Sequence, residues 1–214
     1  YQDDPCTTLF VKFPLRDDKG KLGQYADVSR IYFVIWTTTP WTIPGNMAIC
    51  VNTELDYVLL QVPNGEVYIL AQALAEGVCK AAGIDYAACK PLAVLKGGEF
   101  ELMCAKHPFF DRDSVLLCGE HVTLDAGTGC VHTAPGFGAD DFNICKQYDD
   151  AGLTHIGTPV PVNAKGIMTD EKYNGQYYAA ANEVIPGDLE AAGALLASEK
   201  ITHSSPHCWR CKHP

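Results

Sequence analysis

The stretch that decides the fold is Ile31-Tyr32-Phe33-Val34-Ile35-Trp36-Thr37-Thr38-Thr39-Pro40-Trp41-Thr42-Ile43-Pro44-Gly45-Asn46. Its first part, residues 31–36, is β-branched and aromatic, which predicts a buried strand. Pro40 and Pro44 then remove two backbone donors and favour extended geometry in the residues before them. We therefore expect the strand to end in a stiff loop that carries four threonine hydroxyls.

These four threonines have two interpretations. Each hydroxyl can donate and accept a hydrogen bond, and each β-branched side chain is stiff at χ1. Such a loop suits the recognition of sugar hydroxyls, a terminal phosphate or a small ester. Alternatively, the hydroxyls satisfy local backbone groups, as they often do in Ser/Thr turns. Composition alone leaves both interpretations open.

Three segments resemble the bacterial-type editing (CP1) domain that is inserted in isoleucyl-tRNA synthetase. Residues 36–46, WTTTPWTIPGN, resemble its threonine-rich signature, and residues 127–142, GTGCVHTAPGFGADDF, resemble its second signature, GTGxVHxAPxHGxDDY. Residues 207–214, HCWRCKHP, are similar to the stretch where the chain returns to the synthetase body. Thr39 stands where the leucyl and valyl relatives carry arginine, which favours the isoleucyl type. We expect residues 1–214 to be a single editing domain excised from a larger class I aminoacyl-tRNA synthetase.

Composition limits the class of protein and its partners. The 214 residues are 47% hydrophobic, which is typical of one globular core. A net charge of -10 argues against binding along a phosphate backbone, so we expect contact only with a short nucleic-acid end. No apolar run approaches the roughly 20 residues that span a bilayer. Most of the cysteines lie singly in apolar runs, which favours free thiols and a cytoplasmic location: Cys50, Cys79, Cys118 and Cys130.

The chain alternates many short predicted strands with few helices. Asn64-Gly65 between two apolar runs predicts a hairpin, because this dipeptide tolerates positive φ. Helices are predicted at 71–82, 140–148 and 188–196, the last after the Pro186-Gly187 break. The predicted strands are 6–13, 31–36, 47–51, 57–62, 66–70, 91–96, 100–104, 115–117, 121–124 and 200–204, with a long loop at 157–175. This pattern indicates a mainly β fold with some α structure, a β-barrel-like core decorated by short helices.

Asp140 and Asp141 fall at the predicted start of a helix, where a carboxylate complements the helix dipole and stays ionised. Adjacent helical residues diverge by about 100°, so only one of the two can point into a given pocket. An ionised carboxylate in a concave site is a natural partner for an ammonium group. The spacing does not choose between them. The resemblance does, because the second aspartate of the family's pair holds the α-amino group of the mischarged amino acid.

His132 lies in a β-like run and, by resemblance, lines the amino-acid pocket and helps to exclude a larger aliphatic side chain. A lone histidine on a strand is otherwise typical of a core or surface position. Phe137 departs from the family pattern, which usually has histidine between the glycines that correspond to Gly136 and Gly138. Phenylalanine cannot exchange a proton, so we expect Phe137 only to close the pocket by packing.

Other chemistries find little support in the sequence. Cys208 and Cys211, flanked by His207 and His213, have the residue types of a zinc site, but no second CxxC pair accompanies them. No GxSxG elbow, P-loop or GxGxxG is present. We therefore expect no cofactor and no metal.

The resemblance implies hydrolysis of valine wrongly attached to the isoleucine tRNA. A hydrophobic pocket gains only about 1–3 kcal/mol from one methylene, so a synthetic site alone sorts valine poorly; isoleucyl-tRNA synthetase is the standard example of this argument. We expect an ordered water to attack the ester, with isoleucine excluded by size. The expected partners are the 3′ CCA end of tRNA(Ile) and the rest of the parent synthetase, with no membrane and a monomeric state. The implied catalytic residues are Thr37, Thr38, Thr39, His132 and Asp141, and the implied substrate-binding residues are Trp36, Trp41, Thr42, Asn46, Phe137 and Asp140.

Two alternatives from other classes remain open. The first is a metal-dependent hydrolase that uses His132, Asp140 and Asp141 as ligands. The second is a non-catalytic module that binds an aminoacylated tRNA 3′ end without hydrolysing it.

Overall fold

The computed structural model describes residues 2–205, 209 and 210 of the chain. In this part, ten strands form one sheet in the order β10-β1-β7-β8-β3-β9-β2-β5-β4-β6. A further pairing between β1 and β2 closes six of them, β1, β7, β8, β3, β9 and β2, into a barrel. The predicted mainly β fold with a barrel-like core is therefore confirmed. The strands are β1 (Gln2–Asp17), β2 (Ile31–Thr37), β3 (Ala48–Val51), β4 (Asp56–Gln61), β5 (Val67–Ala71), β6 (Lys90–Lys96), β7 (Cys104–Lys106), β8 (Asp113–Cys118), β9 (Val131–Thr133) and β10 (Leu195–Ser205).

Alternate side chains of β1 and β2 fill the interior of the barrel. Every second residue of β1 from Leu9 to Leu15, and of β2 from Ile31 to Ile35, belongs to the central apolar cluster. The intervening residues Phe10 and Val34 belong to a second cluster, which includes residues of helix α1 (Ala75–Ala81). A period of two is what a strand with two buried faces imposes. The same alternation places Thr37, the last residue of β2, at the end of the barrel on its inner face.

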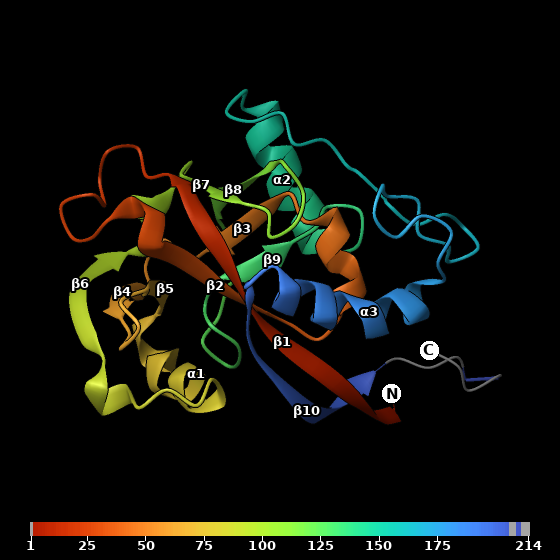
Figure 1. Cartoon of the computed structure of the whole chain (residues 1–214). Helices are drawn as coiled ribbons and strands as arrows, with labels where there is room; N and C mark the ends of the chain where they lie inside the picture. Colours follow the sequence, from red (N-terminus) through yellow and green to blue (C-terminus); the bar gives the residue numbers. More distant parts are fainter. Residues whose placement is uncertain (1, 206–208, 211–214) are drawn as a thin grey trace.

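Short helices cover the barrel, as Figure 1 shows. Helix α2 (Ala139–Asp150) contributes Ile144, Cys145 and Tyr148 to a third apolar cluster, which it shares with β3 and β8. Helix α3 (Tyr178–Ala191) lies against the 3₁₀ helix η2 (Pro40–Gly45), into which the threonine loop folds. The remaining 3₁₀ turns are η1 (Val28–Arg30), η3 (Gln72–Leu74), η4 (Tyr86–Ala88) and η5 (Gly97–Phe100). Within the described residues, no helix has the length and apolarity needed to cross a membrane.

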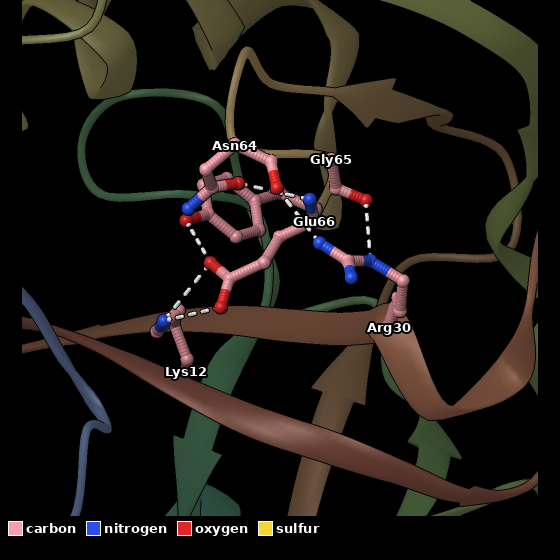
Figure 2. A network of polar contacts seen from close by, with 6 residues as sticks. Lys12, Arg30, Asn64, Gly65 and Glu66 are labelled. Atoms are coloured by element: carbon pink, nitrogen blue, oxygen red, sulfur yellow. Dashed lines mark hydrogen bonds and ion pairs between the residues drawn. The ribbon is translucent and has the colours of Figure 1, made fainter.

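The predicted hairpin is present and is tied to the barrel by a polar network (Figure 2). Gly65 takes a φ of +84°, which the turn between β4 and β5 requires. Arg30 donates from Nε to the Gly65 carbonyl at 2.9 Å and from Nη2 to the Asn64 carbonyl at 2.7 Å. Lys12 of β1 lies 3.0 Å from the Glu66 carboxylate, and both side chains are largely buried. The turn is therefore tied to β1 and to the segment that leads into β2.

The structure corrects three predicted elements. The last helix begins at Tyr178 and runs through Pro186, because Ala181, Ile185 and Leu189, spaced by four, bury one face and outweigh the one lost backbone bond. The strand predicted at 100–104 does not form there, since Leu102 has a φ of +60°, and β7 begins only at Cys104. Residues 121–124 form a turn and loop instead of a strand.

Candidate active site

The site forms where β2 and β9 meet at one end of the barrel. Trp36 pairs in parallel with Val131, and His132 pairs with Ile49 of β3. Cys130 lies in the central apolar cluster while Val131 packs outside it, so alternation directs His132 toward the inner side. The 3₁₀ helix η2 follows β2 directly and covers this end. The two signature segments are thus brought together by strand pairing.

A pocket of about 510 Å³ opens at this junction. Nine of the eleven predicted site residues line it: Trp36, Thr37, Thr38, Thr39, Trp41, Thr42, His132, Phe137 and Asp141. The other two, Asn46 and Asp140, do not. Asn46 is fully buried behind His132, and Asp140 lines an adjoining polar hollow.

Both ring nitrogens of His132 are held by neighbours. Nδ1 lies 2.8 Å from Nδ2 of Asn46, and Nε2 lies 3.0 Å from Oγ1 of Thr42. Asn46 Nδ2 also donates to the Ala48 carbonyl at 2.9 Å, and its Oδ1 accepts from Ser114 at 2.7 Å. A carbonyl oxygen only accepts, so the amide nitrogen must face Ala48 and therefore also faces His132.

This arrangement fixes the protonation state of His132. The Asn46 amide donates to Nδ1, so the proton of the neutral ring is on Nε2 and is donated to Thr42. Thr42 in turn donates its own hydroxyl proton to the Thr39 carbonyl at 2.8 Å. Burial lowers the pKa of His132 to about 4. The ring is a neutral, oriented wall, and neither nitrogen is left to take a proton from a water.

The threonines divide between the two interpretations given by the sequence. Thr37 Oγ1 accepts the backbone N–H of Thr39 at 3.1 Å and lies 3.4 Å from the Thr39 hydroxyl. Thr42 is bonded as described above. These two side chains therefore satisfy local groups. Thr38 is half-buried, and its hydroxyl has no hydrogen-bond partner among the described residues, so it is free for a ligand.

Asp141 stands in the first turn of α2 and folds back over Gly138, where a Cβ would lie 3.0 Å from its Cγ. Its Oδ2 accepts the backbone N–H of Ala134 at 2.9 Å. Burial raises the pKa of Asp141, against the lowering effects of the Ala134 bond and of His121. The sequence predicted that the helix end would stabilise the charged form of Asp141. Burial, which favours the neutral form, has the larger effect on its pKa.

Aromatic rings close the pocket on its η2 side. The rings of Trp41 and Phe137 lie 4.9 Å apart in edge contact, and Trp41 also lies 5.0 Å from Tyr178 of α3. The Trp41 backbone N–H donates to the Asn182 side chain at 3.2 Å. A Cβ on Gly45 would stand 2.5 Å from the Phe137 ring, so glycine is required for this approach. Phe137 therefore packs as a rigid lining group.

Sequence reasoning missed three polar lining residues outside the two signature segments, His121, Thr123 and Asp125, in the connection between β8 and β9. This segment was interpreted as a strand, and no motif marked it. Because the segment is a turn and loop, no strand periodicity in the sequence directs these three side chains to the pocket.

The three ligands of the metal hypothesis do not converge. Asp140 faces a different hollow from Asp141, and both His132 nitrogens are engaged. In the described part of the chain, no three His, Cys, Asp or Glu side chains are grouped as metal ligands. Cys208 and Cys211 lie outside the described residues. The cysteines singled out from the sequence, Cys50, Cys79, Cys118 and Cys130, carry free thiols.

Comparison with known proteins gives a consistent assignment. No family model matches the chain. The chain is 53% identical over 218 residues to isoleucine–tRNA ligase of Caldanaerobacter subterraneus subsp. tengcongensis and 48% identical over 217 residues to that of Caldicellulosiruptor saccharolyticus. Both matches cover 100% of this chain, which spans 22% and 23% of the length of the two ligases.

The fold is similar to solved editing domains. The P. knowlesi cytosolic leucyl-tRNA synthetase editing domain gives a TM-score of 0.71 at 14% identity, over 93% of this chain and 98% of that one. The corresponding P. falciparum domain gives 0.69 at 11% identity, over 92% and 99%. The chain belongs with the editing domains of isoleucyl-tRNA synthetases.

Proposed function

We propose that this editing domain hydrolyses the ester of valine mischarged on tRNA(Ile), with a bound water as the nucleophile. The observation that carries the proposal is the pocket itself. A neutral His132, oriented through both nitrogens, faces the same 510 Å³ space as the carboxylate of Asp141 and the free hydroxyl of Thr38. A wall against the aliphatic side chain, an anchor for the ammonium group and a hydrogen-bonding group are what an α-amino acid ester needs.

Asp141 is the proposed anchor for the α-ammonium group. The Ala134 N–H occupies one side of Oδ2, and a carboxylate has about four lone-pair sites, so acceptor capacity remains for the ligand. A charge-assisted bond in a partly buried site is stronger than a neutral one. Although burial raises the pKa of Asp141, an incoming ammonium group favours its ionised form.

The size filter is proposed to be His132. Because Asn46 and Thr42 hold both nitrogens, the ring cannot rotate away from a larger side chain. Valine and isoleucine differ by one methylene, and overpacking a rigid pocket by that amount costs about 1–3 kcal/mol. The ring contact between Trp41 and Phe137 restrains the pocket on another side.

Water is the proposed nucleophile because the pocket offers no activated side chain. Cys130 lines the pocket, but burial raises the pKa of its thiol far above the usual range, so a thiolate does not form. His132 donates from Nε2 and is not a general base. Thr38 and the substrate's own ribose hydroxyls would hold the water, which is catalysis by placement.

The rest of the proposal follows from charge and environment. A net charge of -10 favours contact with only the 3′ CCA end, while the parent synthetase binds the remaining tRNA. Free buried thiols are typical of cytoplasmic proteins. We also propose that residues 1–214 act as one domain and as a monomer.

A single-turnover time course of deacylation tests this function. Purified chain is mixed with valyl-tRNA(Ile), and loss of the ester is compared with the spontaneous rate in buffer. Hydrolysis well above that rate is expected, and addition of a chelator should leave it unchanged. Binding without accelerated hydrolysis would favour the non-catalytic module, and loss of activity with chelator would favour the metal-dependent hydrolase.

A further inference from the structure

The turn between β7 and β8 holds the end of the threonine loop from outside the pocket. Nε2 of His107 donates to the Ile43 carbonyl at 2.9 Å, and Nη2 of Arg112 donates to the Pro44 carbonyl. His107 has almost no exposed surface, and Arg112 is partly buried. Two successive carbonyls at the end of η2 are thus bonded to side chains of one turn.

The 3₁₀ helix η2 is poorly able to fix its own end. It runs for six residues, whereas 3₁₀ helices longer than three or four residues are uncommon, and Pro40 and Pro44 supply no backbone donor. The last carbonyls of a helix lack partners within the helix. Here the Ile43 carbonyl accepts the N–H of Asn46 at 2.9 Å, and the β7–β8 turn provides the other donors. The position of this end therefore depends on the turn.

The turn in turn holds both donors. Nδ1 of His107 accepts the backbone N–H groups of Phe109 at 3.3 Å and Phe110 at 3.2 Å, so the proton of the neutral ring is on Nε2 and faces Ile43. Burial lowers the pKa of His107 to about 3, so the ring is neutral at neutral pH. The Arg112 guanidinium lies over the Phe110 ring, 5.0 Å from its centroid. Neither donor can swing away from η2 without losing these contacts.

Arg112 occupies its position against a cost of desolvation. Burial lowers the pKa of its guanidinium, and the nearby charges of Asp170 and Glu171 oppose this effect. The Nε atom is buried and has no hydrogen-bond partner among the described residues. An apolar side chain would fill the same space without this cost. What Arg112 supplies, and an apolar side chain does not, is the donor to the Pro44 carbonyl.

The end of η2 leads directly to the residue that orients His132. Asn46 follows Pro44 by two residues, and its side chain contacts Nδ1 of His132 at 2.8 Å. Ser114, which follows Arg112 by two residues, donates to Oδ1 of Asn46 at 2.7 Å. The turn and the start of β8 therefore reach the pocket wall through the backbone of η2 and through the Asn46 amide, although they do not line the pocket.

We propose that Arg112 and His107 are positioning residues for the size filter, which act through the end of η2 to keep the ring of His132 in place. This inference rests on the proposed function, because it concerns how the same pocket sorts valine from isoleucine. Exclusion by size requires a wall that does not yield to one added methylene. The hydrogen bonds of His132 come from Thr42, inside η2, and from Asn46, which ends it. If η2 moved, the wall would move with it, and anchoring η2 to the barrel removes that freedom.

The test measures discrimination between two esters of a short mimic of the tRNA 3′ end, one carrying valine and the other isoleucine. Arg112→Met keeps an unbranched side chain and removes the donor, whereas Arg112→Lys keeps a cationic donor. Arg30→Met is the matched control. Arg30 also donates to two backbone carbonyls, those of Asn64 and Gly65, but in a turn that does not line the pocket.

Arg112→Met should lower the ratio of kcat/KM for the valyl ester to kcat/KM for the isoleucyl ester by about three- to tenfold. This is part of the about five- to hundredfold that one methylene can cost in a rigid pocket. Arg112→Lys should recover part of the ratio, and Arg30→Met should leave it unchanged. Nitrogen-15 signals of the His132 ring should shift in Arg112→Met and not in Arg30→Met. In a His132→Ala background, Arg112→Met should not change the ratio further, because the wall that it positions is absent.

An unchanged ratio in folded Arg112→Met would overturn the proposal and leave Arg112 with a packing role. An equal fall in Arg30→Met would overturn it too, because general loosening of the fold would then explain both results. If Arg112→Met does not fold, His107→Phe, which keeps a ring between Phe109 and Phe110 and removes the donor to Ile43, must lower the ratio for the proposal to stand. A wild type that fails to hydrolyse the valyl ester would instead overturn the proposed function, so the two failures are distinguishable. A thermal melt of each variant confirms that the compared proteins are folded.

Discussion

Nδ2 of Asn46 lies 2.8 Å from Nδ1 of His132, and this contact determines which nitrogen of the ring carries the proton. Asn46 has no exposed surface, so it acts from behind the pocket wall. Its amide orientation is in turn fixed by the Ala48 carbonyl and by Ser114. A residue buried in the fold thereby decides the chemistry of a residue in the pocket.

Asn46→Asp should disrupt this arrangement. The substitution puts an acceptor where Nδ2 now faces the Ala48 carbonyl, leaving buried acceptors unpaired at a cost of about 1–3 kcal/mol in free energy of unfolding. Nitrogen-15 spectra should show the proton of His132 on Nε2 in the wild type and its redistribution in the variant. Asn143→Asp on the exposed face of α2 is the control and should change neither quantity. A wild-type proton on Nδ1 would contradict the assignment.

Acid should weaken the fold through two buried neutral histidines. Burial lowers the pKa of His132 from 6.5 to about 4, and burial lowers that of His107, which is bonded to the Ile43 carbonyl, to about 3. As pH falls below 6.5, the unfolded chain takes up these protons and the folded chain does not. Each histidine therefore lowers the free energy of unfolding by up to about 1.4 kcal/mol per pH unit until its folded pKa is reached.

Urea unfolding across this pH range measures the effect. His107→Gln should reduce the slope, whereas His155→Ala, at an exposed site, should leave it unchanged. Asp141 acts in the opposite direction, because its raised pKa makes the folded state take up a proton first. An equal slope in wild type and His107→Gln would show that His107 is protonated in the fold.

The two adjacent aspartates should differ in activity. Asp141→Ala should lower deacylation by about ten- to a hundredfold, the loss expected for a charge-assisted bond worth about 1.5–3 kcal/mol. Asp140→Ala, which removes an exposed side chain outside the main pocket, should change it by less than about twofold. The measurement is the single-turnover rate of valyl-tRNA(Ile) deacylation by the wild type and by each of the two variants. A larger loss for Asp140→Ala would refute the assignment of the anchor.

Substitutions of two threonines in the same loop should have different effects, one on the deacylation rate and the other on stability. Thr38→Ala should lower the deacylation rate with an unchanged melting temperature, because its hydroxyl has no partner among the described residues. Thr42→Ala leaves the Nε2–H of His132 without an acceptor and should cost about 1–3 kcal/mol of stability. Thermal melts and rates on the same samples give both quantities. A destabilised Thr38→Ala with full activity per folded molecule would reverse these roles.

Local sequence signals predicted much of the fold. The β-branched run at 31–36 and the Asn64-Gly65 turn gave β2 and the β4–β5 hairpin, because strands and tight turns depend on nearby residues. Helix α3 was mispredicted since Pro186 was treated as a break, although Ala181, Ile185 and Leu189 have helical spacing. The barrel closure itself depends on the pairing of β1 with β2, which no local pattern encodes.

The site was predictable only in part. The two signature segments named most of the lining, but their hydrogen bonds depend on packing between distant segments. Asn46 was expected to bind substrate and instead orients His132. The division of labour between Thr38 and Thr42, and the presence of His121 in the pocket, required coordinates.

The central claim is that a rigid His132 sorts valine from isoleucine. The most direct measurement is single-turnover deacylation of valyl-tRNA(Ile) and isoleucyl-tRNA(Ile) by wild type and by His132→Ala, with His132→Gln as a variant that keeps polar atoms beside Asn46 and Thr42. The wild type should hydrolyse the valyl ester and spare the isoleucyl ester. Folded His132→Ala should hydrolyse isoleucyl-tRNA(Ile) about five- to a hundredfold faster than the wild type, since removal of the ring relieves a clash of about 1–3 kcal/mol. An unchanged ratio of valine to isoleucine hydrolysis in both folded variants would contradict the account and place the filter elsewhere, at Phe137 or Trp41.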